Sequence, residues 1–399
     1  MSRQKDRPPS PKRIMVFCRQ SIKSILQNVL LPVYYRAARR APVKKGYVIF
    51  ADLHSSSVPH CMEELLGRVR SAGYEVEEYF FDISALSPIK LWKRLREFMK
   101  LYARAEYVFI CNYFLPASSC EKRPETTLIQ IWHSGGILKK IGRSTPDDVL
   151  PSYIGDPFKN FDYVITSSES CRPVWSEAMG LPEEKFLAFG MPRTDIYFSS
   201  EYRRKCREDF AGMYPESAGK KIALWAPTFR GKPHDPYIVG QEAIAGLASS
   251  LGDGWFVVTS AHPALRKKYP GLVASVPTEN LLPAADILIT DYSSIVFDWL
   301  LYKKPFVIFA PDLEEFEKTR GLYIDSRSMP TTVVTGEADL CGAVLGEYAN
   351  RTAGDLRGFA EYQVGACDGH ACDRILALMQ NISKGNSAAE KEDAFAGSK

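Results

Sequence analysis

The sequence predicts an α/β protein with two domains, each built around a parallel sheet. The chain has 399 residues, which is too long for a single hydrophobic core and suits two domains. Short apolar runs alternate with amphipathic stretches, and this alternation favours parallel strands joined by right-handed helical crossovers. Several of the apolar runs end in polar residues. Ligands of open parallel sheets bind beyond the carboxyl ends of the strands, so these polar residues are expected to converge on one site.

The first half of the chain contains six apolar runs that predict strands and two amphipathic stretches that predict helices. The helices are expected at Cys61–Ala72 and Leu91–Tyr102, and the charged stretch Ser200–Met213 leads into the second half. The expected domains are therefore residues 46–199 and 200–382. The expected strands are Gly46–Ala51, Glu75–Phe81, Tyr107–Cys111, Leu128–Trp132, Tyr163–Thr166 and Lys185–Phe189.

The second half repeats one arrangement three times, in which a predicted strand runs into polar residues. The strands are Lys221–Trp225, Trp255–Thr259 and Asp286–Ile289. A last helix is expected over Cys367–Asn381. Residues 383–399 are polar and rich in Ala, Ser, Glu and Lys, which predicts a disordered tail.

Composition excludes several classes of protein. With 45% hydrophobic and 25% charged residues the chain is ordinary globular, and a net charge of +4 is too small to indicate nucleic-acid binding. The nine cysteines include no Cys-x-x-Cys pair, which argues against a zinc ribbon or a disulfide scaffold and suits a reducing compartment. No His, Asp or Glu group has the spacing of metal ligands, so neither a metal nor a cofactor is expected.

Residues 1–45 are basic and amphipathic. No Asp or Glu occurs between Asp6 and Asp52, and apolar residues recur at spacings of three and four from Met15 to Val33, with Pro32 expected to kink or end the helix. The longest uncharged segment, Ser24–Tyr35, is too short to span a bilayer. The pattern predicts a helix in the interface of an anionic membrane, with a helix packed on the protein body as the alternative.

The strand ends of the second half predict a phosphate site. Asp291-Tyr292-Ser293-Ser294 precedes an apolar run and resembles a strand that turns into a helix, whose free N–H groups bind phosphate. Asp298, one turn further on, could hold ribose hydroxyls. Thr228 and Arg230 follow another strand, where an arginine can clamp a phosphate. Plain helix capping and a solvated loop arginine are the alternatives.

The remaining strand ends carry two histidines. His133 is followed by Ser134-Gly135-Gly136, and glycines allow close backbone approach. Lys139 and Lys140 supply charge for an anionic substrate. A histidine in such a setting suits a general base at neutral pH. His262 follows the strand Trp255–Thr259 and precedes Pro263, and a histidine in such a place, taken alone, is more often structural than catalytic.

Six ordered motifs resemble the CDP-glycerol glycerophosphotransferases, the family of teichoic acid primases and polymerases. The chain has Ser134-Gly135 where many polymerases of the family have Gly-Thr, so the polyol, glycerol or ribitol, stays open. The resemblance covers about residues 46–380. The motifs are Trp132-His133 with Leu138–Gly142, Gly190–Asp195, Ala226–Arg230, His262-Pro263, Ala285–Asp298, and Lys304-Pro305 with Arg320-Gly321 and the closing Asp368–Ile375.

The resemblance implies a GT-B fold, in which two Rossmann-like domains face a central cleft and the C-terminal domain binds a CDP-linked polyol. It implies that His133 is the base for the acceptor hydroxyl and that His262 assists at the donor phosphates. The implied donor site also includes Thr228, Arg230, Ser293 and Ser294.

The resemblance implies an enzyme that transfers a polyol phosphate to a lipid-linked acceptor and releases CMP. Glycerol phosphate is the first candidate for the group transferred. The enzyme is expected on the cytoplasmic side of the cell membrane as a peripheral protein. The expected partners are CDP-glycerol or CDP-ribitol, the lipid-linked acceptor and an anionic membrane, with the oligomeric state left open. Two other interpretations remain: a GT-B glycosyltransferase that uses a UDP- or GDP-sugar, and a non-catalytic membrane scaffold of a polymer-assembly complex.

Overall fold

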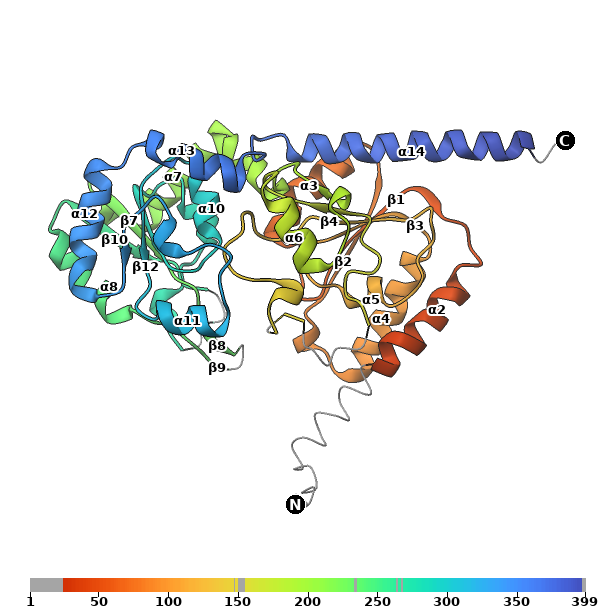
Figure 1. Cartoon of the computed structure of the whole chain (residues 1–399), viewed down its shortest axis with the longest axis horizontal. Helices are drawn as coiled ribbons and strands as arrows, with labels where there is room; N and C mark the ends of the chain where they lie inside the picture. Colours follow the sequence, from red (N-terminus) through yellow and green to blue (C-terminus); the bar gives the residue numbers. More distant parts are fainter. Residues whose placement is uncertain are drawn as a thin grey trace, which may run out of the picture. The chain divides into compact units, whose positions relative to one another are not determined.

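The computed structural model describes residues 24–146, 148–149, 155–232, 235–262, 265–266 and 268–396. The chain divides into two compact units, a first unit of Met1–Gln130 with Pro151–Tyr163 and a second unit of Ile131–Leu150 with Val164–Lys399 (Figure 1). Each unit carries parallel strands, which confirms the predicted α/β class. The domains 46–199 and 200–382, and the cleft between them, stay predictions.

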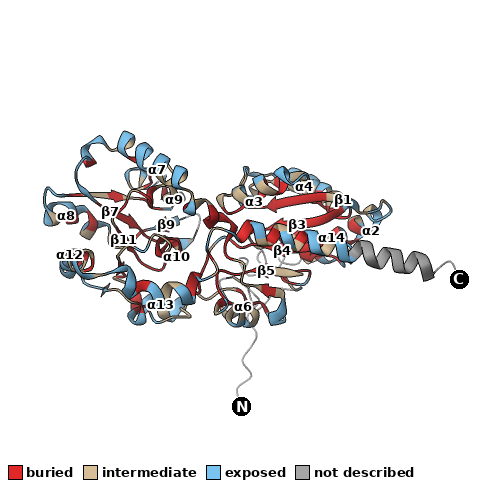
Figure 2. Cartoon of the chain, turned by 90° about the horizontal axis from the view of Figure 1, so that it is seen from above, coloured by how far each residue is buried: buried red, intermediate tan, exposed pale blue. Residues whose placement is uncertain are grey.

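The first unit is built on four parallel strands in the order β2-β1-β3-β4. Their bounds are β1 Lys44–Asp52, β2 Glu75–Phe80, β3 Ala105–Ile110 and β4 Thr127–Gln130. In β1, Ile49 lies opposite Glu77 of β2 and Val108 of β3. Most of β1 and all of β3 are buried, as the red strands of Figure 2 show, because helices cover a parallel sheet on both faces.

Helices α3 (His60–Ser71), α4 (Pro88–Tyr102) and α5 (Leu115–Ser118) join these strands. Helix α4 begins where the sequence supplies both a cap and a first-turn proline: the Ser87 hydroxyl accepts from the Lys90 N–H, and Pro88 needs no N–H partner there. The buried face of α4 stacks Phe98 on Tyr102 at 5.3 Å between ring centroids.

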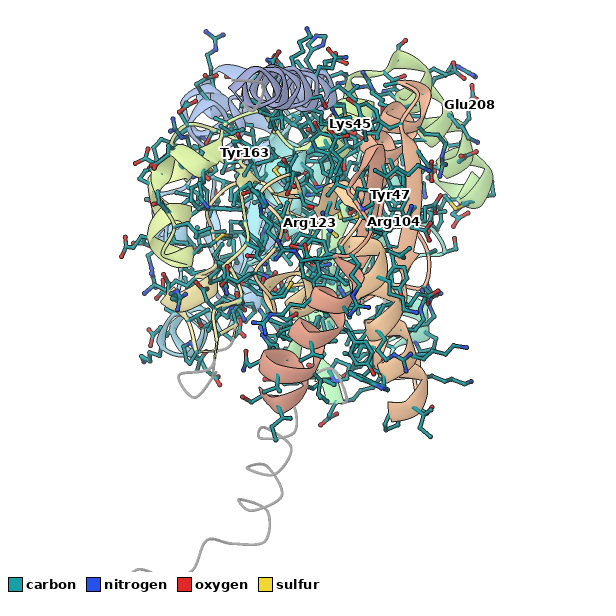
Figure 3. All side chains as sticks on the ribbon, turned by 90° about the vertical axis from the view of Figure 1, so that its right-hand side faces the viewer. Lys45, Tyr47, Arg104, Arg123, Tyr163 and Glu208 are labelled. Carbon is teal, nitrogen blue, oxygen red and sulfur yellow. The ribbon has the colours of Figure 1, made fainter. Side chains whose placement is uncertain are left out.

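The predicted N-terminal helix is described only in its last part, because residues 1–23 lie outside the described residues. The described part is helical, with a π-turn η1 (Leu26–Leu30) followed by α2 (Leu31–Ala38). Pro32 does not end the helix, which runs without a break from η1 into α2. Tyr35 is fully buried and its hydroxyl accepts from the N–H of Arg123, a residue labelled in Figure 3.

The second unit contains a five-stranded parallel sheet in the order β10-β7-β11-β12-β13. Strand β7 pairs with β10 on one side and with β11 on the other, so the chain order reverses between β7 and β11, and ligands of such sheets bind beyond that reversal point. The strands are β7 Lys221–Ala226, β10 Trp255–Thr259, β11 Ile287–Thr290, β12 Phe306–Phe309 and β13 Val333–Val334, with the parallel pair β5 Tyr163–Ile165 and β6 Phe186–Leu187 and the hairpin β8 Arg230–Lys232 and β9 Asp235–Tyr237.

Helices complete the second unit. A core formed by the strands, by α8 (Gln241–Leu251) and by α12 (Leu340–Asn350) contains Trp225, Leu247, Ile289 and Val344. The sequence predicted a disordered tail from Ser383, whereas α14 continues to Ala396 in the structure. The Ala, Glu and Lys residues of this stretch are good helix formers, which accounts for the difference. The helices are α6 Cys171–Met179, α7 Ser200–Met213, α8 Gln241–Leu251, α9 Thr278–Leu281, α10 Ile295–Leu300, α11 Leu313–Thr319, α12 Leu340–Asn350, α13 Ala353–Val364 and α14 Ala371–Ala396.

Candidate functional site

A cavity of about 520 Å³ lies in the second unit, beyond the carboxyl ends of β7, β10 and β11. It brings together predicted residues from both halves of the sequence, because the segment after β4 belongs to the second unit. The described residues that line it are His133, Arg193, Ala226, Pro227, Ser260–His262, Arg266, Val273–Glu279, Ser293–Ile295 and Asp298.

The ends of β7 and β11 are joined by hydrogen bonds. The N–H of Thr228 donates to Oδ1 of Asp291 at 2.8 Å, and the Thr290 hydroxyl donates to the Ala226 carbonyl at 2.7 Å. Within the described residues, the buried Thr228 hydroxyl oxygen has no hydrogen-bond partner. A buried hydroxyl without a partner costs free energy. Thr228 is nevertheless not among the residues that line the cavity, so its contact with a ligand stays a prediction.

Ser293 and Ser294 stand at the beginning of α10 and line the cavity. The Ser294 side chain makes no capping hydrogen bond, so simple capping does not account for it. The Ser293 hydroxyl lies 3.4 Å from the Ile295 N–H, a weak contact. Both hydroxyls therefore remain available as donors, which fits the predicted phosphate site.

Arg230 has a different environment from the one that its predicted role requires. Its Nε and Nη2 donate to Asp312 at 2.7 and 3.0 Å, Nη2 also donates to Asp291 at 2.9 Å, and Nη1 donates to the Thr228 carbonyl. The side chain is buried and is not among the cavity residues. Its guanidinium holds the pKa of Asp312 below the usual range, although burial of Asp312 opposes this. In the structure Arg230 thus links the loop that contains Asp291 to the loop that contains Asp312. Its contact with phosphate stays a prediction.

The carboxylate of Asp298 forms an ion pair within the protein. Both of its carboxylate oxygens lie within 2.8 Å of Nη2 of Arg193, and both side chains are buried. Nη1 of Arg193 lies 3.5 Å from Oε1 of Glu279. Arg193 and Glu279 were not predicted as site residues. Arg193 falls in the quoted Gly190–Asp195 motif, which could have indicated it, whereas the sequence around Glu279 carries no comparable signal.

His262 lies in the loop beyond the end of β10, in the cavity wall, with its ring 4.9 Å from that of Phe229. Burial lowers the pKa of His262, the positive charge of Lys139 lowers it further, and Glu279 opposes both effects. The imidazole is therefore neutral near pH 7 in the absence of ligand. Bound phosphate would raise the pKa again, because negative charge favours the protonated form.

His133 projects from a backbone that is held in an unusual conformation. The preceding residue, Trp132, has a backbone φ of +53°, which residues other than glycine rarely adopt. Its buried ring stacks on the His133 ring, with 5.0 Å between the ring centroids. Such strain is maintained only where the surrounding structure enforces it, and it is common at functional sites. The same conformation ends β4 at Gln130, two residues earlier than predicted.

The two glycines after His133 allow this loop to pack closely. The N–H of Gly136 donates to the Ser167 hydroxyl at 2.7 Å. Gly136 has φ +65°, and a Cβ there would lie 2.5 Å from the ring of Phe297 in α10. A Cβ on Gly135 would lie 3.3 Å from Cβ of Ser167. The glycines therefore let the loop after His133 pack closely against α10, and their place on the acceptor side stays a prediction.

Lys139 and Lys140 are anchored through their backbone to a second motif. The Lys140 N–H donates to the Gly321 carbonyl at 3.2 Å, and Arg320 pairs with Asp148 at 2.8 Å. Burial lowers the pKa of Lys139 to about 8, with Arg320 and Arg230 adding to the effect and Asp291 opposing it. Lys139 thus contributes positive charge beside the cavity that weakens in alkaline solution.

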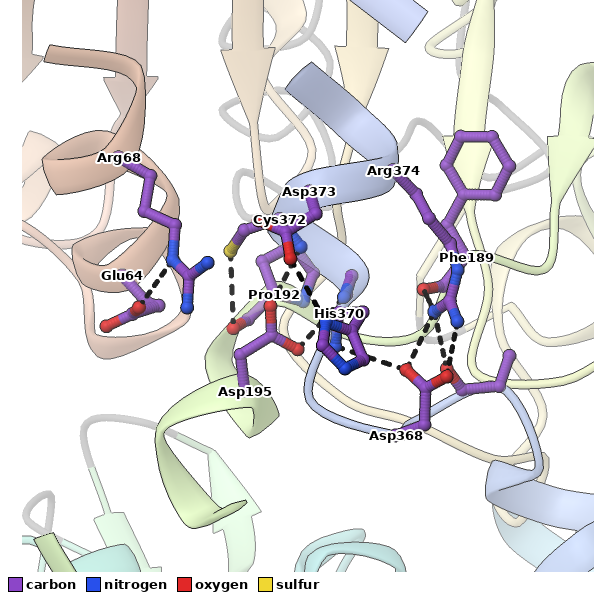
Figure 4. Close-up of polar contacts among 12 residues, drawn as sticks. Glu64, Arg68, Phe189, Pro192, Asp195, Asp368, His370, Cys372, Asp373 and Arg374 are labelled. Atoms are coloured by element: carbon purple, nitrogen blue, oxygen red, sulfur yellow. Dashed lines mark hydrogen bonds and ion pairs between the residues drawn. The ribbon is translucent and has the colours of Figure 1, made fainter. Parts of the chain in front are cut away.

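Other motif residues hold the second unit together. Asp195 accepts the N–H groups of Ala371 and Cys372 at 3.0 and 2.8 Å and so caps α14 from 176 residues away in sequence (Figure 4). Asp368 pairs with Arg374, which also donates to the Phe189 carbonyl at 2.9 Å. These residues stabilise the fold rather than the chemistry. Within the described residues, no cluster of His, Cys, Asp and Glu could hold a metal ion.

Gly136→Ala is expected to destabilise the second unit by about 2 kcal/mol or more and to lower turnover. The new methyl group must displace Phe297, and alanine is strained at positive φ. Urea unfolding and an activity assay measure both effects. Gly246→Ala is the control, because this glycine lies in α8 with open space around it, and alanine there should be neutral or stabilising by up to about 1 kcal/mol. Equal behaviour of the two variants would contradict the packing argument.

A parallel sheet with polar loops gathered around one cavity defines an α/β protein that binds its ligand beyond the carboxyl ends of its strands. The chain belongs to the CDP-Glycerol:Poly(glycerophosphate) glycerophosphotransferase family, whose model matches residues 33–381. It is thus a transferase of the CDP-glycerol glycerophosphotransferase type.

Relatives and solved structures agree with this family. The chain is 32% identical over 311 residues to the teichoic acid ribitol-phosphate primase of Bacillus spizizenii, covering 72% of this chain and 78% of the primase. It is 27% identical over 380 residues to the poly(ribitol-phosphate) polymerase of the same organism, covering 88% of this chain but only 59% of the polymerase. The wall teichoic acid polymerase TagF shares the fold, with a TM-score of 0.68 and 19% identity over 93% of this chain and 98% of that chain.

Proposed function

We propose that this chain transfers a polyol phosphate from a CDP-linked donor to a hydroxyl of a lipid-linked acceptor and releases CMP, in the synthesis of a teichoic-acid-like polymer. The observation that carries the proposal is the single cavity shared by His133, His262, Ser293 and Ser294. A TagF variant of the same fold has been soaked with CDPG, which supports a CDP-linked donor.

The proposed reaction is an in-line displacement at phosphorus. The acceptor oxygen forms a bond to the β-phosphorus of the donor, the bond from that phosphorus to the CMP oxygen breaks, and the acceptor proton passes to His133. Positioning and charge stabilisation supply most of the rate in phosphoryl transfer. The Thr228, Ser293 and Ser294 hydroxyls are proposed to bond the phosphates, and His262 is proposed to donate a hydrogen bond beside them.

The donor identity can be tested directly. The purified protein is incubated with anionic membranes that carry the lipid-linked acceptor. Separate reactions contain CDP-glycerol, CDP-ribitol, a UDP-sugar or a GDP-sugar, and the release of CMP, UDP or GDP is measured. CMP release from either CDP-polyol is expected, with CDP-glycerol as the first candidate and CDP-ribitol supported by the ribitol-phosphate primase and polymerase. UDP or GDP release would indicate a glycosyltransferase, and no release with any donor would indicate a non-catalytic scaffold.

Peripheral attachment to the cytoplasmic face of an anionic membrane is the second part of the proposal. No helix among the described residues has the length and hydropathy needed to cross a bilayer. Ile25, Val29 and Val33 form an exposed apolar stripe, each more than half exposed, although Tyr35 on the opposite side of α2 is buried. Helix α4 packs beside α2 (Figure 1), adds the 83% exposed Ile89 and carries several basic residues. An apolar stripe among basic side chains favours shallow insertion into anionic lipid.

Replacing Val29 and Val33 together by Asp is expected to reduce vesicle binding at least tenfold, because two apolar side chains are lost from the inserted surface and two negative charges face anionic lipid. Substitution is preferable to deletion, since deletion would remove the buried Tyr35. Flotation with neutral and anionic vesicles measures binding. Leu345→Asp, at an exposed leucine of α12, is the control. Unchanged flotation of the double variant would rule out this surface.

A further inference from the structure

We propose that Glu279 is the carboxylate that binds the ribose hydroxyls of the donor nucleotide, and that Asp298 serves as a positioning residue for Arg193. This inference rests on the proposed function, because it takes the ligand of the cavity to be a nucleotide. Among the described residues that line the cavity, Glu279 and Asp298 are the two carboxylates. The sequence favoured Asp298, because it stands one turn after the phosphate-binding serines.

Asp298 is bound too tightly to serve the sugar. Its side chain is 2% exposed, and its Oδ1 and Oδ2 lie 2.8 and 2.7 Å from Nη2 of Arg193. A hydroxyl could reach this carboxylate only by competing with a buried ion pair. Breaking such a pair leaves an uncompensated charge in a region from which water is excluded. The geometry therefore assigns Asp298 to holding the guanidinium in place.

Glu279 meets the requirements that Asp298 fails. Its side chain is 21% exposed and lines the cavity, so ligand can reach it. Its backbone is fixed, because its carbonyl and the side-chain oxygen of Asn280 both accept from the Tyr202 hydroxyl, at 3.4 and 3.0 Å. The contact of Glu279 with Arg193, 3.5 Å between Oε1 and Nη1, is looser than that of Asp298.

The chemistry of the ligand matches this division of the cavity. Phosphate oxygens need donors, which the hydroxyls of Ser293 and Ser294 supply, whereas the vicinal 2′- and 3′-hydroxyls of ribose are best held by a carboxylate, which can accept two hydrogen bonds. The positive charge of Arg193 favours the ionised form of the nearby carboxylate, and hydrogen bonds to an ionised group are stronger than neutral ones.

The test compares CMP with 2′,3′-dideoxy-CMP by isothermal titration calorimetry on the full-length protein. The wild type is expected to bind CMP about tenfold or more tightly than the dideoxy nucleotide, the factor typical of a charged hydrogen bond. Glu279→Ala should reduce this ratio to below about twofold while leaving the affinity for dideoxy-CMP unchanged. Asp298→Asn should keep the ratio and lower the melting temperature. Glu216→Ala, at an exposed residue that does not line the cavity, should change neither.

A wild type that does not distinguish the two nucleotides, or a Glu279→Ala protein that still does, would overturn the inference. Loss of the ratio in a folded Asp298→Asn protein together with its retention in Glu279→Ala would return the role to Asp298. If Asp298→Asn fails to fold, the Glu279→Ala result decides alone. If the wild type binds UMP or GMP but not CMP, the proposed donor is wrong, and the matching dideoxy nucleotide then tests Glu279 independently.

Discussion

His133→Ala is expected to lower the rate of CMP release by about 10²–10⁴-fold while leaving the Kd for CMP within about twofold of the wild-type value. A general base contributes a factor of this size to the chemical step, and its loss does not remove contacts with the bound nucleotide. The expectation depends on the strained backbone at Trp132 and on the close packing of Gly136 against Phe297, which fix His133 at the cavity.

Steady-state CMP release and calorimetry with CMP provide the two measurements. His370→Ala is the matched control, because this histidine is 67% exposed, pairs with Asp373 and does not line the cavity. It should leave both the rate and the affinity near wild-type values. Turnover of His133→Ala within about threefold of wild type would remove His133 from the role of base, whereas a large loss of CMP affinity would make it a binding residue instead.

Arg230→Met is expected to lower the free energy of unfolding by about 3–5 kcal/mol. The substitution leaves Asp291 and Asp312 without the guanidinium that joins them, and an unpaired buried carboxylate is costly. Urea unfolding measures the change. Arg204→Met is the control, since its ion pairs with Glu201 and Glu208 are exposed and should contribute less than about 1 kcal/mol.

The pH dependence of the free energy of unfolding gives a second test of the ion pairs that Arg230 forms. Arg230 holds the pKa of Asp312 below its unfolded value, so this stabilisation is present above the unfolded pKa and is lost as the pH falls through the folded pKa. The wild type should therefore lose stability in acid more steeply than Arg230→Met does. An Arg230→Met protein of unchanged stability but weak CMP binding would instead support the sequence-based prediction of a phosphate clamp.

The sequence predicted most strands and the residues that follow them. Strand β10 has the predicted bounds, β7 differs from its prediction by one residue, and β2 ends one residue early, because buried parallel strands appear in sequence as short apolar runs. The prediction missed β12 and β13, since four- and two-residue strands give little pattern. It also placed His133, His262, Ser293 and Ser294 at strand ends, and these four residues line one cavity.

The sequence alone determined the α/β class, the polar strand ends and the family motifs, because strand burial and loop chemistry are encoded over a few neighbouring residues. Only the tertiary structure decided how the charged residues pair. Arg230 meets Asp291 across 61 positions and Asp312 across 82, and Arg193 meets Asp298 across 105. No local pattern specifies such partners. Whether an arginine contacts a ligand or braces a loop depends on which carboxylates the folded chain brings within hydrogen-bond distance of it.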